Sequence, residues 1–209
     1  MNADGPAEAH AVATESRRFF IVTAARTGST LLSAILADAG AEFGMTPPRR
    51  WNRAGGDLEH PDLWRALRYF SDAETLSMMG RPPFGIARMR WNIYRSLGKK
   101  RLREGLRRAR FAKVYGAHKL VRPAFKIGYF PTVILSYRRI EDQALSLGLK
   151  YPHANWEFLR DNYLHVYRNG LLLLNMFGGC VVGYDDILDP ADTSWRKRWL
   201  VRRGCRRQS

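Results

Sequence analysis

A strand-like run that leads through a glycine-containing turn into a helical pattern constrains this 209-residue chain more than any other feature. Residues 19–22 are all apolar, and residues 31–36 are apolar except for one serine, so we predict a strand over 17–24 and a helix over 29–39. A helix start leaves backbone N–H groups unsatisfied, and the helix dipole favours an anion there. The turn is therefore typical of a phosphate-binding site, and it consists of Arg26, Thr27, Gly28, Ser29 and Thr30.

The same turn lacks the spacing of an ATP-binding P-loop. That motif has the form G-x-x-x-x-G-K-[ST], in which the lysine reaches the phosphates. Residues 26–30 contain a single glycine and no lysine. We therefore expect a phosphate ligand other than ATP. An ordinary helix start is the alternative interpretation, since Thr and Ser cap helices routinely.

Strand and helix patterns alternate along the rest of the chain. The helical patterns are residues 62–79, 95–113, 141–150 and 156–177, and the strand-like runs are residues 112–121, 132–137 and 180–182. This order predicts a single α/β domain over residues 17–194, with a P-loop-like parallel sheet flanked by helices. Residues 1–16 are predicted to be a disordered leader. Residues 195–209 hold seven basic residues and no acidic one, and they are predicted to form a basic tail.

The charge and the cysteine content narrow the classes of ligand. The net charge of +16 and the pI of about 10.5 indicate anionic partners, and residues 95–113 are typical of a solvated helical face or of contact with an acidic surface. The two cysteines give no disulfide framework, and no cluster has metal-ligand spacing, so we expect no metal.

The first residues lack a signal-peptide pattern and the longest apolar run is too short to span a bilayer, so we expect a cytoplasmic protein.

A second anion-binding pattern follows the strand predicted over residues 132–137. Arg138 lies at the end of this strand, and Asp142 and Ser146 are four residues apart, on one face of the next helix. A guanidinium beside a hydroxyl can bind a phosphate through charge-assisted hydrogen bonds. Both patterns lie at carboxyl ends of strands, where ligands bind in parallel sheets. Two separate anion sites suit a nucleotide with phosphates at both ends of its ribose.

Together these segments resemble the sulfotransferases that use 3′-phosphoadenosine 5′-phosphosulfate (PAPS), most closely their bacterial and Golgi branches. The resemblance implies that the turn holds the 5′-phosphosulfate, with Arg26 as the basic residue of the family's motif. It implies that Arg138 and Ser146, which match the family's R-x-x-x-x-x-x-x-S element, bind the 3′-phosphate. Residues 184–190 resemble the family's Y-E-D-L segment, which would place Tyr184 near the adenine.

Two candidates for the general base come from the same resemblance. Residues 52–61 are similar to the N-P-x-G-x-x-E segment of bacterial members, which makes Glu59 one candidate. Residues 116–119 are similar to the strand that carries the catalytic histidine in cytosolic members, so His118 is the other, and Lys119 matches a lysine of that strand in other branches. A histidine has the more suitable ordinary pKa, whereas a carboxylate needs its pKa raised. Both candidates stay open.

The expected function is transfer of the sulfuryl group of PAPS to a hydroxyl or amine of a carbohydrate, a lipid or a small metabolite. The late R-K-G-x-x-G segment of cytosolic members is absent, so one alternative is a family member that binds the nucleotide without transferring sulfate. The other alternative is a basic nucleic-acid-binding protein, favoured by the charge alone. The chain has no RNP motif, zinc knuckle or clear helix-turn-helix pattern, so we expect no specific nucleic-acid partner.

Overall fold

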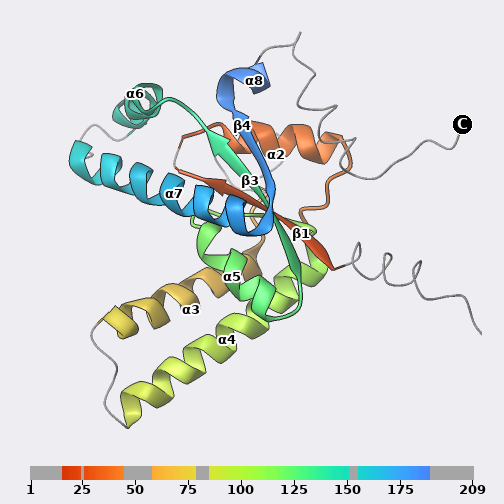
Figure 1. The fold of residues 1–209 in the computed structure, drawn as a ribbon, viewed down its shortest axis with the longest axis vertical. Helices are drawn as coiled ribbons and strands as arrows, with labels where there is room; N and C mark the ends of the chain where they lie inside the picture. The colour runs from red at the N-terminus through yellow and green to blue at the C-terminus, as the bar shows by residue number, and fades with distance from the viewer. Residues whose placement is uncertain (1–15, 25, 45–57, 79–84, 151–154, 189–209) are drawn as a thin grey trace, which may run out of the picture.

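Four parallel strands form one sheet in the order β2-β1-β3-β4 (Figure 1). The computed structural model describes residues 16–24, 26–44, 58–78, 85–150 and 155–188. The strands are β1 (Arg17–Thr23), β2 (Phe111–Lys113), β3 (Phe130–Tyr137) and β4 (Gly179–Gly183). The chain passes from β1 to β2 on one side and later to β3 on the other side of β1. The strand order therefore reverses at β1, and in open parallel sheets ligands bind at the carboxyl ends of the strands at such a point.

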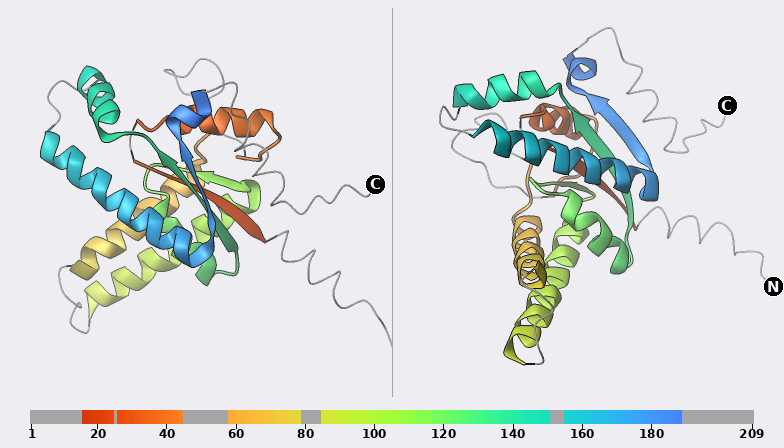
Figure 2. Two further views of the ribbon diagram at one scale, coloured as in Figure 1. Left: turned by 45° about the horizontal axis from the view of Figure 1, so that its top comes forward. Right: turned by 60° about the vertical axis from the view of Figure 1, so that its left-hand side comes forward.

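Helices cover both faces of the sheet. They are α2 (Ser29–Asp38), α3 (Pro61–Met78), α4 (Ile86–Arg108), α5 (His118–Lys126), α6 (Ile140–Lys150), α7 (Trp156–Phe177) and α8 (Tyr184–Leu188). The helices α2 and α8 pack on one face, whereas α5 and α7 pack on the other. The helices α3 and α4 form an antiparallel hairpin that extends away from the sheet (Figures 1 and 2). Within the described ranges, no helix combines the length and the apolar composition that crossing a bilayer requires.

The apolar run of β1 explains the position of the turn that follows it. Phe19 and Ile21 pack in the core beneath α2, and Phe20 and Val22 pack in the core beneath α5 and α7. A strand that is buried on both faces needs such a continuous apolar run. Because β1 pairs with both β2 and β3, the turn after Thr23 lies at the centre of the sheet's carboxyl edge.

Most of the predicted elements are confirmed. The bounds of β1, α2, α3, β3, α6, α7 and β4 agree with the predicted ranges to within one or two residues. The helix predicted over 95–113 is present as α4, which begins earlier, at Ile86, and ends at Arg108. The predicted leader, apart from Ser16, and the predicted tail lie outside the described residues, as does most of the segment 52–61.

The strand predicted over residues 112–121 is wrong. β2 ends at Lys113, and a helix, α5, begins at His118. Gly116 between them has a φ of 92°, and this left-handed conformation turns the chain out of the sheet. The apolar residues that follow, Leu120 among them, form the buried face of a short helix rather than a strand. Periodicity alone does not distinguish a strand from a buried helix in so short a run.

Candidate functional site

A buried threonine fixes the turn after β1 to the sheet. The side chain of Thr27 is fully buried, and its hydroxyl bonds to the hydroxyls of Thr23 and Ser136 at the ends of β1 and β3. Oγ of Ser136 lies 3.1 Å from Oγ1 of Thr27 and 3.3 Å from its carbonyl oxygen. Arg26 and Gly28 have positive φ angles of 64° and 78°, which turn the chain sharply on either side. The hydroxyl of Thr27 therefore has a structural role, because it holds the turn against the sheet.

The start of α2 carries a buried cation. Gly28 is the N-cap residue and has no side chain to bond the first amides, and the first turn of α2 contains no acidic residue. Nζ of Lys113, at the end of β2, donates to Oγ1 of Thr30 at 3.0 Å, and Lys113 is only 3% exposed. This cation and the helix dipole both favour an anion at the start of α2. Sequence reasoning missed Lys113, and the available signal was a charged residue at the end of a buried strand.

Segments that are far apart in the sequence meet at this turn. Nε of Arg26 donates to Oγ of Ser146 at 2.9 Å. Nη1 of Arg138 lies 3.4 Å from the carbonyl oxygen of Arg26, and the guanidinium carbon of Arg138 lies 4.3 Å from the centre of the Tyr184 ring. That ring covers Gly28, where an added Cβ would lie 2.3 Å from Cδ2 of Tyr184. The structure thus brings together five residues that the sequence predicts to bind a nucleotide. We call this group the Gly28 cluster, and its members are Arg26, Gly28, Arg138, Ser146 and Tyr184.

Arg138 is the least satisfied member of the Gly28 cluster. Its Nε is buried and has no hydrogen-bond partner among the residues that the structure describes. Within the described ranges, its Nη1 makes only the long contact to the carbonyl oxygen of Arg26. Leaving a buried donor of a charged group unpaired costs free energy. An anionic acceptor at this position would therefore stabilise the arrangement.

A buried tyrosine of α7 holds the strand end from which Arg138 extends. Oη of Tyr167 donates to the carbonyl oxygen of Ser136 and accepts from Nε2 of Gln143, both at 3.1 Å. Burial raises the pKa of Tyr167, and burial also raises the pKa of the neighbouring Tyr163 to about 12. These uncharged phenols fix the chain direction at the end of β3. The sequence carried no signal for this role, because Tyr167 fits the apolar face of a long helix.

Glu59, one candidate base, lies just before α3, where the hairpin joins the rest of the molecule. Its Oε2 accepts from Nε1 of Trp64 at 2.7 Å.

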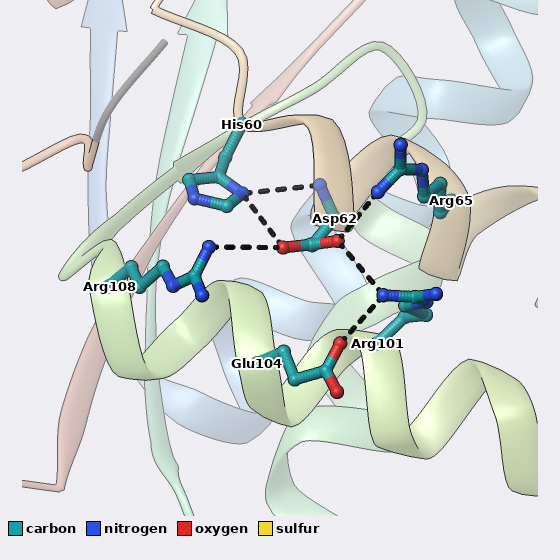
Figure 3. A network of polar contacts seen from close by, with 6 residues as sticks. All are labelled: His60, Asp62, Arg65, Arg101, Glu104 and Arg108. Atoms are coloured by element: carbon teal, nitrogen blue, oxygen red, sulfur yellow. Dashed lines mark hydrogen bonds and ion pairs between the residues drawn. The ribbon is translucent and has the colours of Figure 1, made fainter.

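His60, which follows Glu59, caps α3, because its Nδ1 accepts from the backbone N–H of Asp62 at 3.2 Å. Asp62 then ties α3 to α4 (Figure 3). The ion pairs are Asp62 with Arg65 (3.2 Å), Arg101 (3.5 Å) and Arg108 (3.8 Å), and Arg101 with Glu104 (3.0 Å).

The cap formed by His60 makes the stability of the protein depend on pH. Burial lowers the pKa of His60 from its ordinary value of 6.5, with Asp62 opposing the effect and Arg108 adding to it. The unfolded chain therefore binds a proton more readily than the folded one, so stability falls as the pH drops below 6.5. The change His60→Asn keeps a good cap that does not titrate. In urea unfolding between about pH 5 and 7, we expect the free energy of unfolding to rise less steeply with pH in this variant than in the parent. Equal slopes would contradict this account.

His118 and Lys119, the other predicted catalytic residues, lie at the start of α5 and line a cavity. The described lining residues come from α3, α4, α5 and α7, and none of them belongs to residues 26–30. The ring of His118 meets the ring of His165 edge-on, with the ring centres 5.6 Å apart. The two candidate bases are therefore carried by two different parts of the fold, the start of α3 and the start of α5.

Comparisons with known proteins give no match: no protein-family model, no curated protein and no solved structure matches this chain. Among the described residues, no group of three or more His, Cys, Asp or Glu side chains could hold a metal ion.

Proposed function

We propose that the Gly28 cluster binds PAPS and that the protein transfers the sulfuryl group of PAPS to a hydroxyl or amine of an acceptor. The observation that carries this proposal is the contact between the two predicted phosphate sites, in which Arg26 donates to Ser146. These two residues are separated by 120 positions in the sequence. A single nucleotide with phosphates at both ends of its ribose requires two such sites side by side.

The 5′-phosphosulfate is assigned to the turn and the start of α2. Arg26, Lys113 and the open amides of α2 supply positive charge there. Thr27 holds the turn rigidly against β1 and β3, so these donors are preorganised. Preorganised donors act most strongly on charge that develops during a reaction.

The 3′-phosphate is assigned to Arg138 and Ser146. The guanidinium of Arg138 is always charged and presents several donors in one plane, which suits a phosphate. Its stacking on Tyr184 fixes that plane beside Gly28. The ring of Tyr184 lies beside both Gly28 and Arg138, and this position supports the proposal that it contacts the nucleoside.

In the proposed reaction, the acceptor atom attacks the sulfur in line with the bond to the bridging phosphate oxygen. That bond breaks, the sulfuryl group moves to the acceptor, and adenosine 3′,5′-bisphosphate leaves. Negative charge grows on the leaving phosphate, where Arg26, Lys113 and the α2 amides would stabilise it. The acceptor loses its proton to a base, for which Glu59 and His118 are the candidates.

Isothermal titration with adenosine 3′,5′-bisphosphate tests the binding step, with ATP as the comparison nucleotide. We expect saturable binding of the bisphosphate and weaker binding of ATP, because ATP has no 3′-phosphate for Arg138. Heat no greater than the dilution background for the bisphosphate would contradict the proposal. Labelled PAPS incubated with carbohydrate, lipid and small-metabolite acceptors then tests transfer. Loss of the true base in Glu59→Gln or His118→Asn should slow transfer by about a hundredfold or more.

A further inference from the structure

A cavity of about 400 Å³ lies among α3, α4, α5 and α7, on the sheet face opposite α2. Small-molecule sites in proteins commonly have volumes of about 300–1,000 Å³. In Figure 1, α5 lies between α4 and α7. All three helices contribute residues to the lining of the cavity. We call this space the α5 cavity.

Two helices give the α5 cavity a strongly positive wall. Arg95 and Lys99 are one helical turn apart on α4, and Lys119, Arg122 and Lys126 lie on one face of α5. None of the described lining residues is an Asp or a Glu. Like charges gathered around a cavity with low-dielectric walls focus the electric field and attract anions.

The remaining wall of the α5 cavity is apolar and aromatic. Phe70 of α3, Trp91 of α4, and Leu172 and Leu173 of α7 line it. The guanidinium carbon of Arg95 lies 4.4 Å from the centre of the Trp91 ring, so a cation and an aromatic face occur together. A purely inorganic anion would leave this apolar wall without a partner.

We propose that the α5 cavity binds a small organic anion whose charged group is a carboxylate, sulfonate or phosphate ester and whose other end is apolar or aromatic. The charged group contacts the lysines and arginines of α4 and α5, and its charge offsets their mutual repulsion. The apolar end packs against Trp91 and the leucines of α7. The lining includes His118, a candidate base of the proposed reaction, but no residue of the Gly28 cluster, so the cavity is distinct from the proposed nucleotide site.

A pair of matched fluorescent probes tests this proposal on the full-length protein. The anionic probe is 8-anilinonaphthalene-1-sulfonate, and its neutral counterpart is N-phenyl-1-naphthylamine. Titrations are run at about 0.15 M NaCl, where the Debye length of about 8 Å suppresses long-range attraction. The test variant is Lys99→Gln/Lys126→Gln. The control is Lys100→Gln/Arg103→Gln, which removes the same charge from exposed positions of α4 that do not line the cavity.

We expect the test variant to bind the anionic probe about tenfold more weakly than the parent, and the control to bind it within about twofold of the parent. We expect the anionic probe to bind the parent more tightly than the neutral probe does. We also expect saturating adenosine 3′,5′-bisphosphate to leave the affinity for the anionic probe unchanged. Equal weakening in both variants would overturn the proposal, because net charge alone would then explain the binding. The proposal would also be overturned if the parent bound the two probes with equal affinity, or if the bisphosphate displaced the anionic probe. Unfolding midpoints of both variants without probe confirm that each is folded.

Discussion

Gly28→Ala is expected to lower the affinity for adenosine 3′,5′-bisphosphate by at least about tenfold. The added Cβ would lie 2.3 Å from a ring carbon of Tyr184, so the ring has to move. Arg138 stacks on this ring, and the guanidinium moves with it. Hydrogen bonds to charged groups contribute about 1.5–3 kcal/mol, so a displaced guanidinium accounts for a loss of this size. Isothermal titration of the variant measures the effect.

Gly40→Ala is the matched control for this change. Gly40 lies just beyond the other end of α2 and has a φ of 86°, close to the 78° of Gly28. A Cβ at Gly40 meets no atom within 4 Å. Both substitutions should therefore destabilise the fold by about 1–2 kcal/mol through backbone strain, but only Gly28→Ala should weaken nucleotide binding. A loss of affinity of the same size in both variants would show that general destabilisation is the cause.

Arg138→Gln is expected to weaken binding of adenosine 3′,5′-bisphosphate by about ten- to a hundredfold, since it removes the charge assigned to the 3′-phosphate. The glutamine keeps a polar planar group, so the buried surroundings lose little packing. Nε of Arg138 has no hydrogen-bond partner within the described part of the chain, so its removal breaks no bond at that atom. The free energy of unfolding should change far less than the free energy of binding adenosine 3′,5′-bisphosphate. Titration calorimetry and urea unfolding of the same preparation separate the two effects.

The neighbouring Arg139 supplies the control for Arg138. It is exposed and pairs with Glu141 at 3.8 Å, outside the Gly28 cluster. Exposed ion pairs contribute about 0–1 kcal/mol, so Arg139→Gln should change neither stability nor affinity by more than a small amount. The two variants carry the same change in net charge. An equal loss of affinity in both would mean that Arg138 acts only through the overall charge of the protein.

The sequence predicted those parts of the fold and of the site that depend on local pattern. The strand, turn and helix around Gly28 follow from an apolar run, a glycine and a helical repeat, and all three occur between Arg17 and Asp38. The spacing between Arg138 and Ser146 likewise spans a single strand-to-helix connection, with Arg138 directly after β3 and Ser146 within α6. Side chains at the carboxyl ends of neighbouring parallel strands then lie close together because of the strand order.

The remaining features depend on contacts between distant segments. Lys113 reaches Thr30 only because β2 pairs with β1, and one lysine in an apolar run does not predict that pairing. Tyr167 holds the end of β3 through a hydroxyl that no periodicity distinguishes from other helical residues. The sequence pattern predicts a strand at His118, whereas the left-handed Gly116 places this residue at a helix start.

The central claim is that one nucleotide spans the turn at Gly28 and the pair formed by Arg138 and Ser146. The most direct test compares the affinities for adenosine 3′,5′-bisphosphate and adenosine 5′-phosphate in the parent and in Arg138→Gln. We predict that the parent prefers the bisphosphate by about tenfold or more and that the variant binds both nucleotides almost equally, because the proposal assigns only the 3′-phosphate to Arg138. An unchanged preference in the variant, or equal affinities in the parent, would contradict the claim.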